Sequence, residues 1–437
     1  MIELTILFTC FHHILDKTTA SQLRIIVHSL LIMNGRITML SISRWAGKGG
    51  SYRTIQRFFQ KEIDWLLLNW ALIKNLIEQD NDEVILIAGD TTTVSKTGKY
   101  TYGLGRFFSS LFSRRICGIA FQTLSIITVK SRRSWPILTE QLEPQPKEKR
   151  KNKTSKPKQK RKRGRPLGSK NKNRRDVELN AELTQIQKML KRVLGLIKGT
   201  TNIVYFIYDG AFGNNVAVQM TRQVGLHIIS KLRNNAALCF KYEGKQNQKG
   251  RRKVYGSRID YQNIATKYLL YTEHSQNSYS RIYQCVALHS KFADLLNVVI
   301  IIKKDLVTGK EGRVILFSSD LELEGKKIVE YYRLRFQIEF NFRDAKQHWG
   351  LEDFMVTTKQ SVLNFANLSL FMVNLSHILL RRSEEVSILD LKSRYHSLFY
   401  AKEILKLVLK TGHDIIIEPL FEKVPILGRI HKRKKVA

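Results

Sequence analysis

Cysteine is scarce in this sequence, and its few cysteines lie far apart. None of them forms a CxxC pair, and none stands at metal-ligand spacing from a histidine. A disulfide framework and a zinc site of the usual spacing are therefore excluded. We expect ordinary buried thiols in a reducing compartment. The four cysteines are Cys10, Cys117, Cys239 and Cys285.

Long uninterrupted apolar runs are also missing. The N-terminal stretch is apolar, but Asp16, Lys17, Arg24 and His28 interrupt it. Its longest clean run is far shorter than the roughly 20 residues that cross a bilayer. It also lacks a basic segment followed by a small-residue cleavage site, which a secretory signal would have. We therefore expect a soluble cytoplasmic protein that spans no membrane.

Acidic residues are few relative to basic ones. The 437 residues contain 74 Lys and Arg against 37 Asp and Glu, which gives a formal net charge of +37 and a pI near 10.1. An excess of this size indicates a polyanionic partner, and nucleic acid is the first candidate. The hydrophobic share of 43% is normal for a globular chain. The length suits roughly two to four packed units.

The first 80 residues have the pattern of packed helices. A helix over residues 39–46 is followed by a glycine-rich turn at residues 47–50, and a second helix begins after Ser51, a favourable N-cap. The arrangement resembles a helix-turn-helix that would present Arg53 and Arg57 to DNA. A plain helical hairpin is the alternative.

Residues 144–176 form a basic segment with almost no apolar side chain. Such a segment cannot bury a core and is predicted to be disordered when free. Within it, Arg163, Gly164 and Arg165 resemble an AT-hook, because glycine lets the backbone lie deep in a narrow A·T minor groove, where arginine meets high negative potential. The alternative is sequence-independent contact with phosphates. A P-loop is excluded, since the glycine spacing is wrong and no strand precedes it.

Two short apolar runs each stop at an aspartate. Residues 84–89 are typical of a buried strand that delivers Asp90 to the rim of a sheet, and residues 202–208 do the same for Asp209. The two carboxylates are therefore expected at the ends of strands.

Further strands and a helix are predicted around these runs. Residues 100–104 and 116–129 are expected to form strands of a meander beside the first run. A helix over residues 215–224 and a strand over residues 225–233 follow the second run. This strand–helix–strand order predicts an α/β core.

Residues 234–318 are β-rich and basic. Their tyrosines alternate with Lys and Arg, and Arg251 and Arg252 lie in the most basic stretch. Aromatic side chains among cations suit stacking on unpaired bases and binding of backbone phosphates. Strands also favour tyrosine for packing reasons, which is the alternative.

The stretch of residues 331–346 contains no Pro or Gly and is predicted to be one helix. At about 100° per residue, Tyr332, Arg335, Glu339 and Lys346 share a stripe roughly 60° wide. A carboxylate flanked by two cations and a phenol suits a metal ion beside a phosphate. A solvated, salt-bridged helix face is the alternative.

Three carboxylates are thus singled out, namely Asp90, Asp209 and Glu339. If the two strands are neighbours and the helix packs across them, these acids converge and repel each other unless divalent cations neutralise them. Oxygen ligands and a phosphate substrate favour Mg²⁺, with Mn²⁺ as a substitute. A pair of such ions would activate a water or a 3′-hydroxyl and stabilise the leaving oxygen. Cleavage or transfer of phosphodiester bonds is the predicted chemistry.

The helical stripe and the two aspartates together resemble the DDE transposases of bacterial insertion sequences. The spacing Y-x2-R-x3-E-x6-K matches the Y-R-E-K signature of the IS-four family, and the likeness extends from about residue 84 to residue 354. It implies an RNase H-like catalytic core that is interrupted by a β-rich insertion before the final glutamate. The residues implied are Asp90, Asp209 and Glu339 for two metal ions, and Tyr332, Arg335 and Lys346 for phosphates of the cleaved end.

The same resemblance implies cut-and-paste DNA transposition, with cleavage at the element ends, a hairpin intermediate and strand transfer into target DNA. The implied partners are double-stranded DNA and a second copy of the chain, within the nucleoid of a bacterial cytoplasm. Relatives that form hairpins can hold a flipped base with an inserted tryptophan. No tryptophan lies between Asp209 and Glu339 in this sequence.

Two rival functions remain open. One is an RNase H-like DNA endonuclease without strand transfer, and the other is a non-catalytic DNA-binding protein derived from a transposase, which the three intact acids argue against. The predicted domains are an N-terminal helical DNA-binding domain (1–80), three parts of a catalytic core (84–143, 177–233 and 319–385), a basic linker (144–176), a β-rich insertion (234–318) and a helical C-terminal region with a basic tail (386–437).

Overall fold

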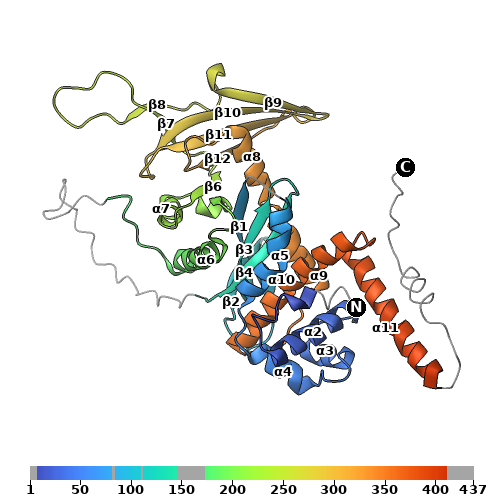
Figure 1. Cartoon of the computed structure of the whole chain (residues 1–437). Coiled ribbons are helices and arrows are strands. Elements are labelled where there is room, and N and C mark those ends of the chain that lie inside the picture. Colours follow the sequence, from blue (N-terminus) through green and yellow to red (C-terminus); the bar gives the residue numbers. More distant parts are fainter. Residues whose placement is uncertain (1–6, 81–83, 110–111, 145–172, 411–437) are drawn as a thin grey trace. The chain divides into compact units, whose positions relative to one another are not determined.

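The computed structural model describes residues 7–80, 84–109, 112–144 and 173–410. The chain forms two compact units, and each of them combines helices with strands, so the predicted mixed α/β class is confirmed (Figure 1). The first unit contains Met1–Leu142, Arg192–Asn202 and Arg335–Ala437, and the second contains Glu143–Lys191 and Ile203–Leu334.

The N-terminal part of the first unit is helical, as predicted. Ser51 caps one of these helices, because its hydroxyl accepts a hydrogen bond from the backbone N–H of Thr54 at 3.3 Å. The glycine turn lies between this helix and the preceding one, at the expected place. The helices are α2 (Lys17–Ile32), α3 (Met39–Trp45), α4 (Tyr52–Gln60) and α5 (Trp65–Asp80).

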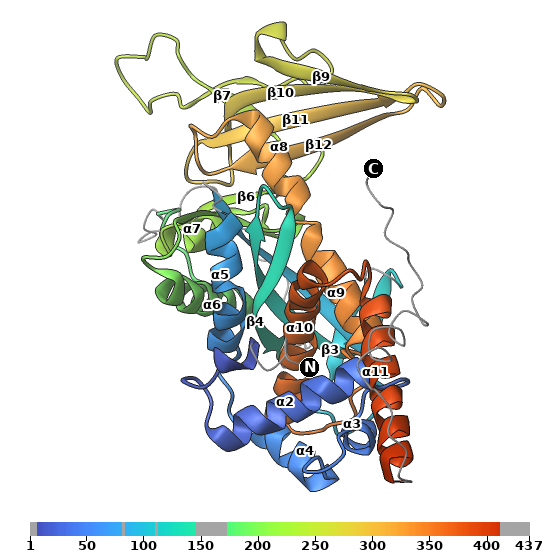
Figure 2. The same ribbon diagram turned by 45° about the vertical axis from the view of Figure 1, so that its right-hand side comes forward.

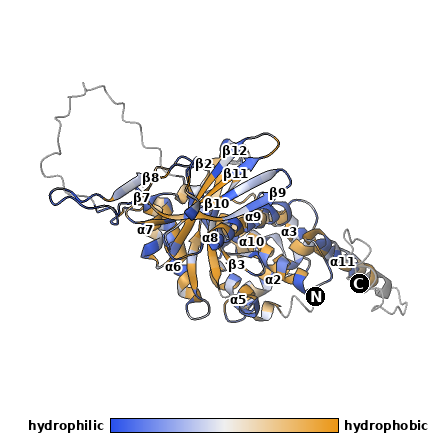
Figure 3. Ribbon diagram, turned by 90° about the horizontal axis from the view of Figure 1, so that it is seen from above, coloured by the Kyte–Doolittle hydropathy of each residue, from blue (hydrophilic) through white to orange (hydrophobic). Residues whose placement is uncertain are grey.

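The sheet of the first unit is built around β3, which is hydrophobic along most of its length (Figure 3). One edge of β3 pairs with β1, and the other edge pairs first with β2 and then with β4, all antiparallel. Residues 100–104 do not form the predicted strand, and β4 was not predicted. The strands are β1 (Ile85–Ser95), β2 (Gly105–Ser109), β3 (Arg114–Thr128) and β4 (Arg133–Leu142).

Helix α10 (Lys359–Arg382) is the core of the first unit (Figure 2). It packs against β4, α4, α5, α9 (Gln337–His348) and α11 (Ile388–Lys410). Its Asn364 donates to the carbonyls of Phe59 and Lys61, both at 2.8 Å, and so satisfies the C-terminal end of α4. By length and composition α10 could cross a membrane, but nearly all of its most apolar part is buried inside the structure, as in a core helix.

The second unit contains the predicted strand–helix–strand element. Strands β5 (Ile203–Ile207) and β6 (His227–Leu232) are parallel, and α7 (Asn215–Gln223) connects them. Helix α6 (Ala181–Ile197) precedes β5, and its first part belongs to this unit. Parallel pairing requires such a crossover, so this part of the α/β prediction is confirmed.

Beyond β6 the second unit is β-rich, as predicted for residues 234–318 (Figure 1). The strand order continues through β12, β11, β10, β7 and β8, with β9 also paired to β10, and all these pairs are antiparallel. Helix α8 (Gly325–Leu334) follows the last strand. The strands are β7 (Leu238–Lys241), β8 (Tyr255–Arg258), β9 (Leu269–Ser275), β10 (Ser278–His289), β11 (Leu296–Asp305) and β12 (Glu311–Ser318), and a 3-10 turn, η2 (Thr266–Tyr268), precedes β9.

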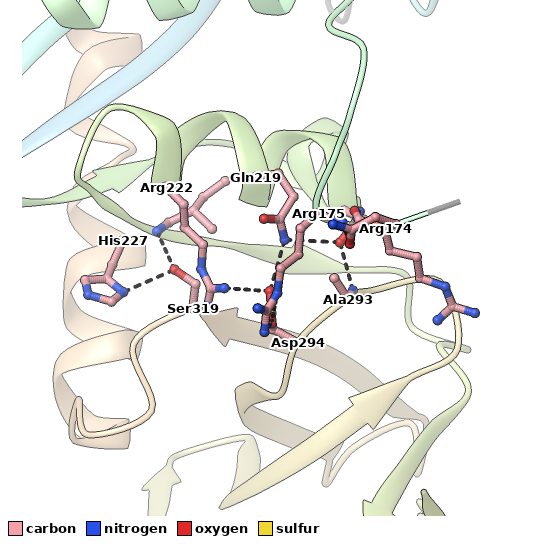
Figure 4. Close-up of polar contacts among 11 residues, drawn as sticks. Arg174, Arg175, Gln219, Arg222, His227, Ala293, Asp294 and Ser319 are labelled. Atoms are coloured by element: carbon pink, nitrogen blue, oxygen red, sulfur yellow. Dashed lines mark hydrogen bonds and ion pairs between the residues drawn. The ribbon is translucent and has the colours of Figure 1, made fainter. Parts of the chain in front are cut away.

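Asp294, in the loop between β10 and β11, joins three segments of the second unit (Figure 4). Its Oδ1 accepts from the guanidinium of Arg175 at 2.7 Å, and its Oδ2 accepts from Arg222 and, at 3.1 Å, from Gln219. Burial opposes ionisation of Asp294, but hydrogen bonds and the two cations lower its pKa below the ordinary value. The cluster therefore fixes α7, which follows Asp209, to this loop and to the segment that leads into α6.

The strand that carries Asp90 is longer than predicted. We expected it to end at Asp90, but β1 continues to Ser95 and pairs with β3 along its whole length. The three threonines after Asp90 are β-branched and favour a strand, which explains the extension.

The predicted helix over residues 331–346 is not continuous. Helix α8 ends at Leu334 and α9 begins at Gln337, although the sequence between them contains no Pro or Gly. The boundary between the two units falls at this break. The prediction that one helix carries all four signature residues is therefore wrong, because Tyr332 is on α8 and the other three follow it in the first unit.

Candidate active site

Asp90 lies at the point where β1 leaves the buried interior. Residues 85–89 are buried, whereas Asp90 is partly exposed. Its Oδ1 accepts a hydrogen bond from the backbone N–H of Thr91 at 2.8 Å, and the Gln122 amide of β3 donates to its carbonyl at 3.2 Å. Strand pairing and these bonds hold the carboxylate in place on the sheet.

The guanidinium of Arg335 contacts both predicted catalytic acids of the first unit. Its Nη1 donates to Oδ2 of Asp90 at 2.8 Å, and its Nη2 donates to Oε1 of Glu339 at 3.1 Å. The Arg335 and Asp90 side chains are only 14% and 18% exposed, whereas Glu339 is 42% exposed. The structure thus brings three of the predicted site residues together around one cation.

Lys346 also reaches β1 and is paired with an acid. Its Nζ donates to the carbonyl of Thr93 at 3.0 Å and lies 3.1 Å from Oε1 of Glu352. Lys96, immediately after β1, donates to the carbonyls of Glu352 and Phe354 at 2.8 and 2.7 Å. Burial lowers the pKa of Lys96 to about 8. Lys96 thereby fixes the loop after α9, which holds the carboxylate of Glu352 against Lys346.

Asp209 follows β5 in the second unit, at the end of a buried strand as predicted. Its Oδ1 accepts from a backbone N–H two residues later at 3.0 Å, which begins the 3-10 turn η1 (Gly210–Phe212). The hydroxyl of Ser230 donates to its carbonyl at 2.6 Å. Gly213 follows η1, and a Cβ at this position would lie 2.3 Å from the carbonyl oxygen of Lys231. Only glycine allows β6 to approach so closely.

Tyr332 lies on α8, and α8 contacts β5 within the second unit. The neighbouring Tyr331 is buried, and its ring centroid lies 5.7 Å from that of Tyr205 on β5. The Tyr205 hydroxyl donates to Oδ2 of Asp320 at 2.7 Å. Burial raises the pKa of Tyr205 above its ordinary value, so the phenol stays protonated as the donor. Tyr331, the residue before Tyr332, thus contacts the strand that leads to Asp209.

The acids of the first unit fit a divalent cation by their chemistry. Asp90 and Glu339 are oxygen donors that already share one positive group, and Mg²⁺ and Mn²⁺ prefer such ligands. Asp209, the third predicted ligand, belongs to the second unit. Among the described residues, no group of three or more His, Cys, Asp or Glu side chains is arranged to hold a metal ion.

The other predicted DNA contacts lie on separate elements. Arg53 and Arg57 are exposed on α4, and Arg251 and Arg252 are exposed between β7 and β8. The AT-hook-like residues 163–165 lie outside the described residues.

Several tyrosines of the β-rich part have a cation of this chain over the ring. The distances from the cation to the ring centroid are 4.5 Å (Tyr242 and Lys253), 3.9 Å (Tyr261 and Arg313), 5.0 Å (Tyr268 and Lys267) and 5.6 Å (Tyr271 and Lys326).

Comparison with known families decides the class of the protein. A family model described as DDE superfamily endonuclease matches residues 7–288, which is well over half of the chain. The chain belongs to the DDE superfamily endonuclease family. The match includes Asp90 and Asp209 and ends before Glu339.

The predicted DDE class of this endonuclease is therefore confirmed. Among solved structures, a piggyBac transposase in a synaptic complex with hairpin DNA is similar, with a TM-score of 0.40 and 10% sequence identity. The similarity covers 94% of this DDE endonuclease and 76% of that chain. No curated protein matches the sequence significantly.

Three residues of this site were missed in the sequence. Thr93 contributes only its carbonyl to Lys346, Lys96 acts through backbone carbonyls, and Glu352 stands six residues after Lys346 in a loop. A backbone acceptor leaves no signal in side-chain chemistry, and a loop has no periodicity that predicts a contact. The packing of α9 against β1 brings these groups together.

Proposed function

We propose that this DDE superfamily endonuclease is a DNA transposase of the kind found in bacterial insertion sequences. Its catalytic core would be RNase H-like, and residues 332–346 would be the Y-R-E-K signature of the IS-four family. The observation that carries the proposal is the contact of both Asp90 and Glu339 with Arg335. It supports a site in which acids and phosphate-binding cations act side by side.

Asp90, Asp209 and Glu339 would hold two Mg²⁺ ions, or Mn²⁺ ions in their place. When bound, such ions activate a water or a 3′-hydroxyl and stabilise the leaving oxygen. Arg335 and Lys346 would bind phosphate oxygens of the cleaved end and hold the phosphodiester in place. Tyr332 would add a hydrogen bond to the same strand.

The proposed partners are the double-stranded ends of the element and the target DNA, bound by a dimer of the chain in the nucleoid of a bacterial cytoplasm. The exposed Arg53 and Arg57 on α4 would contact one of these duplexes, and Arg251 and Arg252 would add phosphate contacts. Each neutralised phosphate adds about 0.9 to the slope of log affinity against log salt. We therefore expect DNA binding to weaken steeply as salt rises.

The test is a pair of reactions with the purified chain. A plasmid that carries the DNA flanking its gene should be nicked in Mg²⁺, and labelled flanking DNA with a free 3′-hydroxyl should become joined to a second plasmid. Absence of nicking in both Mg²⁺ and Mn²⁺ would overturn the proposal. EDTA provides the matched control, because it removes the ion and leaves the DNA and the protein unchanged.

An endonuclease without strand transfer is the second candidate, and the family description favours it because that description names only cleavage. The joining reaction separates the two candidates. Nicking without joined product supports the endonuclease, whereas joined product supports the transposase.

A further inference from the structure

The guanidinium of Arg335 is a single positive charge that contacts two carboxylates. It reaches Asp90 through Nη1 and Glu339 through Nη2, at 2.8 and 3.1 Å. Two carboxylates and one guanidinium carry a net charge of about −1, so one cation of single charge leaves the pair incompletely neutralised. A divalent cation bound to the same oxygens would complete the neutralisation.

We propose that Arg335 is an exchangeable counter-ion of Asp90 and Glu339. A divalent cation displaces the guanidinium from the two acids, and the displaced guanidinium then binds a DNA phosphate. The inference rests on the proposed function for the identity of both ligands. It assigns Arg335 a role in the DNA-free protein, namely to hold the two acids together until the ion arrives.

The exposure of the three side chains suits such an exchange. Glu339 is 42% exposed and gives an ion access, whereas Asp90 and Arg335 are largely shielded from water. The attraction within a shielded pair is strong, so the guanidinium competes with the metal ion for the two acids. Metal binding and phosphate binding should therefore favour each other, and thermodynamic linkage makes the two effects equal in size.

Mn²⁺ binding to the full chain without DNA tests the exchange, measured by titration calorimetry. Removing an opposite charge next to a carboxylate raises its affinity for a proton by about 10-fold or more. We expect Arg335→Gln to raise Mn²⁺ affinity on the same order, about 10-fold. Arg343→Gln is the matched control, because Arg343 is on α9, the helix that carries Glu339, and pairs with Asp344. It should leave Mn²⁺ affinity unchanged.

Two further measurements make the test specific. In a Glu339→Gln background, Arg335→Gln should raise Mn²⁺ affinity by less, since the charged contact between Arg335 and Glu339 is already gone. With a short duplex, Mn²⁺ should strengthen DNA binding by the wild type more than by Arg335→Gln. If Arg335→Gln does not fold, Arg335→Lys replaces it, because an ammonium lacks the fork that reaches both acids and should give a smaller gain.

The outcomes separate this inference from the proposed function. Tighter Mn²⁺ binding by the Arg335 variants supports the exchange whether or not the chain nicks DNA. Unchanged Mn²⁺ affinity in a chain that does nick DNA overturns the exchange and leaves the proposed function standing.

Discussion

The ammonium of Lys346 lies 3.1 Å from Oε1 of Glu352, so this predicted phosphate ligand already has an anion. A DNA phosphate that binds Lys346 must replace the Glu352 carboxylate, which is 50% exposed and free to move into water. Ion pairs of such exposure contribute little to stability, and their loss is easily compensated by water. If Lys346 binds DNA as proposed, the pair should tune DNA affinity without holding the fold together.

Glu352→Gln should strengthen DNA binding, because the lysine then has no competing carboxylate. The expected gain is about two- to fivefold, the range that an exposed ion pair allows. Fluorescence anisotropy with a short duplex at low salt measures it. Glu78→Gln is the control, since Glu78 pairs with Lys74 on α5 and changes the net charge equally. An equal gain in both variants would show that only net charge matters.

Gly213→Ala should destabilise the turn that carries Asp209. A Cβ at this position would meet the carbonyl oxygen of Lys231 at 2.3 Å, and we expect a loss of roughly 1–3 kcal/mol in the free energy of unfolding. Gly195→Ala, inside α6, is the contrasting variant, because no atom lies within 4 Å of its Cβ. It should stabilise the chain by up to about 1 kcal/mol. Urea denaturation compares the two, and similar values would contradict the tight approach.

Asp294→Asn should weaken the second unit. It removes the charge that Arg175 and Arg222 share, and Asp294 itself is only 11% exposed. Because both arginines retain access to water, we expect a loss of about 2 kcal/mol, below the range for fully buried pairs. The control is Glu273→Gln, whose pair with Arg333 is exposed on both sides and should cost less than about 1 kcal/mol. Equal losses in the two variants would refute a joining role for Asp294.

Lys392 gives the stability a defined pH dependence. Burial lowers its pKa from 10.5 to about 8, and the nearby Asp353 offsets only part of this effect. The folded chain therefore holds this proton less tightly than the unfolded chain, so the free energy of unfolding rises between about pH 8 and pH 10.5. Lys392→Met removes that rise. Its stability relative to the wild type should be most favourable at pH 7 and should decline by pH 10 in urea titrations.

If the difference in the free energy of unfolding between Lys392→Met and the wild type stays constant from pH 7 to pH 10, folding does not lower the pKa of Lys392. Lys406→Met is the control, because Lys406 is exposed on the same helix and pairs with Glu403. This variant removes a lysine charge from the same helix without removing a buried ammonium.

The sequence predicts the buried parts of this protein better than the limits of its elements. The apolar run before Asp90 marks where β1 is buried, but the hydrogen-bonded strand continues through the threonines to Ser95. Conversely, the stretch around Arg335 contains no helix breaker, yet the helix ends at Leu334. Local propensity carries no sign of that break, because the contact of Arg335 with Asp90 is tertiary.

The site was predictable to the extent that its side chains form patterns. The spacing of Arg335, Glu339 and Lys346 predicts that they share a face, and all three do contact β1 or its aspartate directly or through Arg335. Glu352, the acid that pairs with Lys346, lies in a loop and belongs to no such spacing pattern. Its pairing depends on where Lys96 holds the loop after α9.

The most direct test of the proposed function is the rate of Mg²⁺-dependent nicking by three single variants, Asp90→Asn, Asp209→Asn and Glu339→Gln, each checked for unchanged DNA binding. Each substitution would remove the charge of one proposed metal ligand and nearly preserves side-chain shape, so nicking should fall by on the order of a hundredfold or more in every case. Wild-type nicking by any one of the three would contradict the assignment of a shared metal site to these acids.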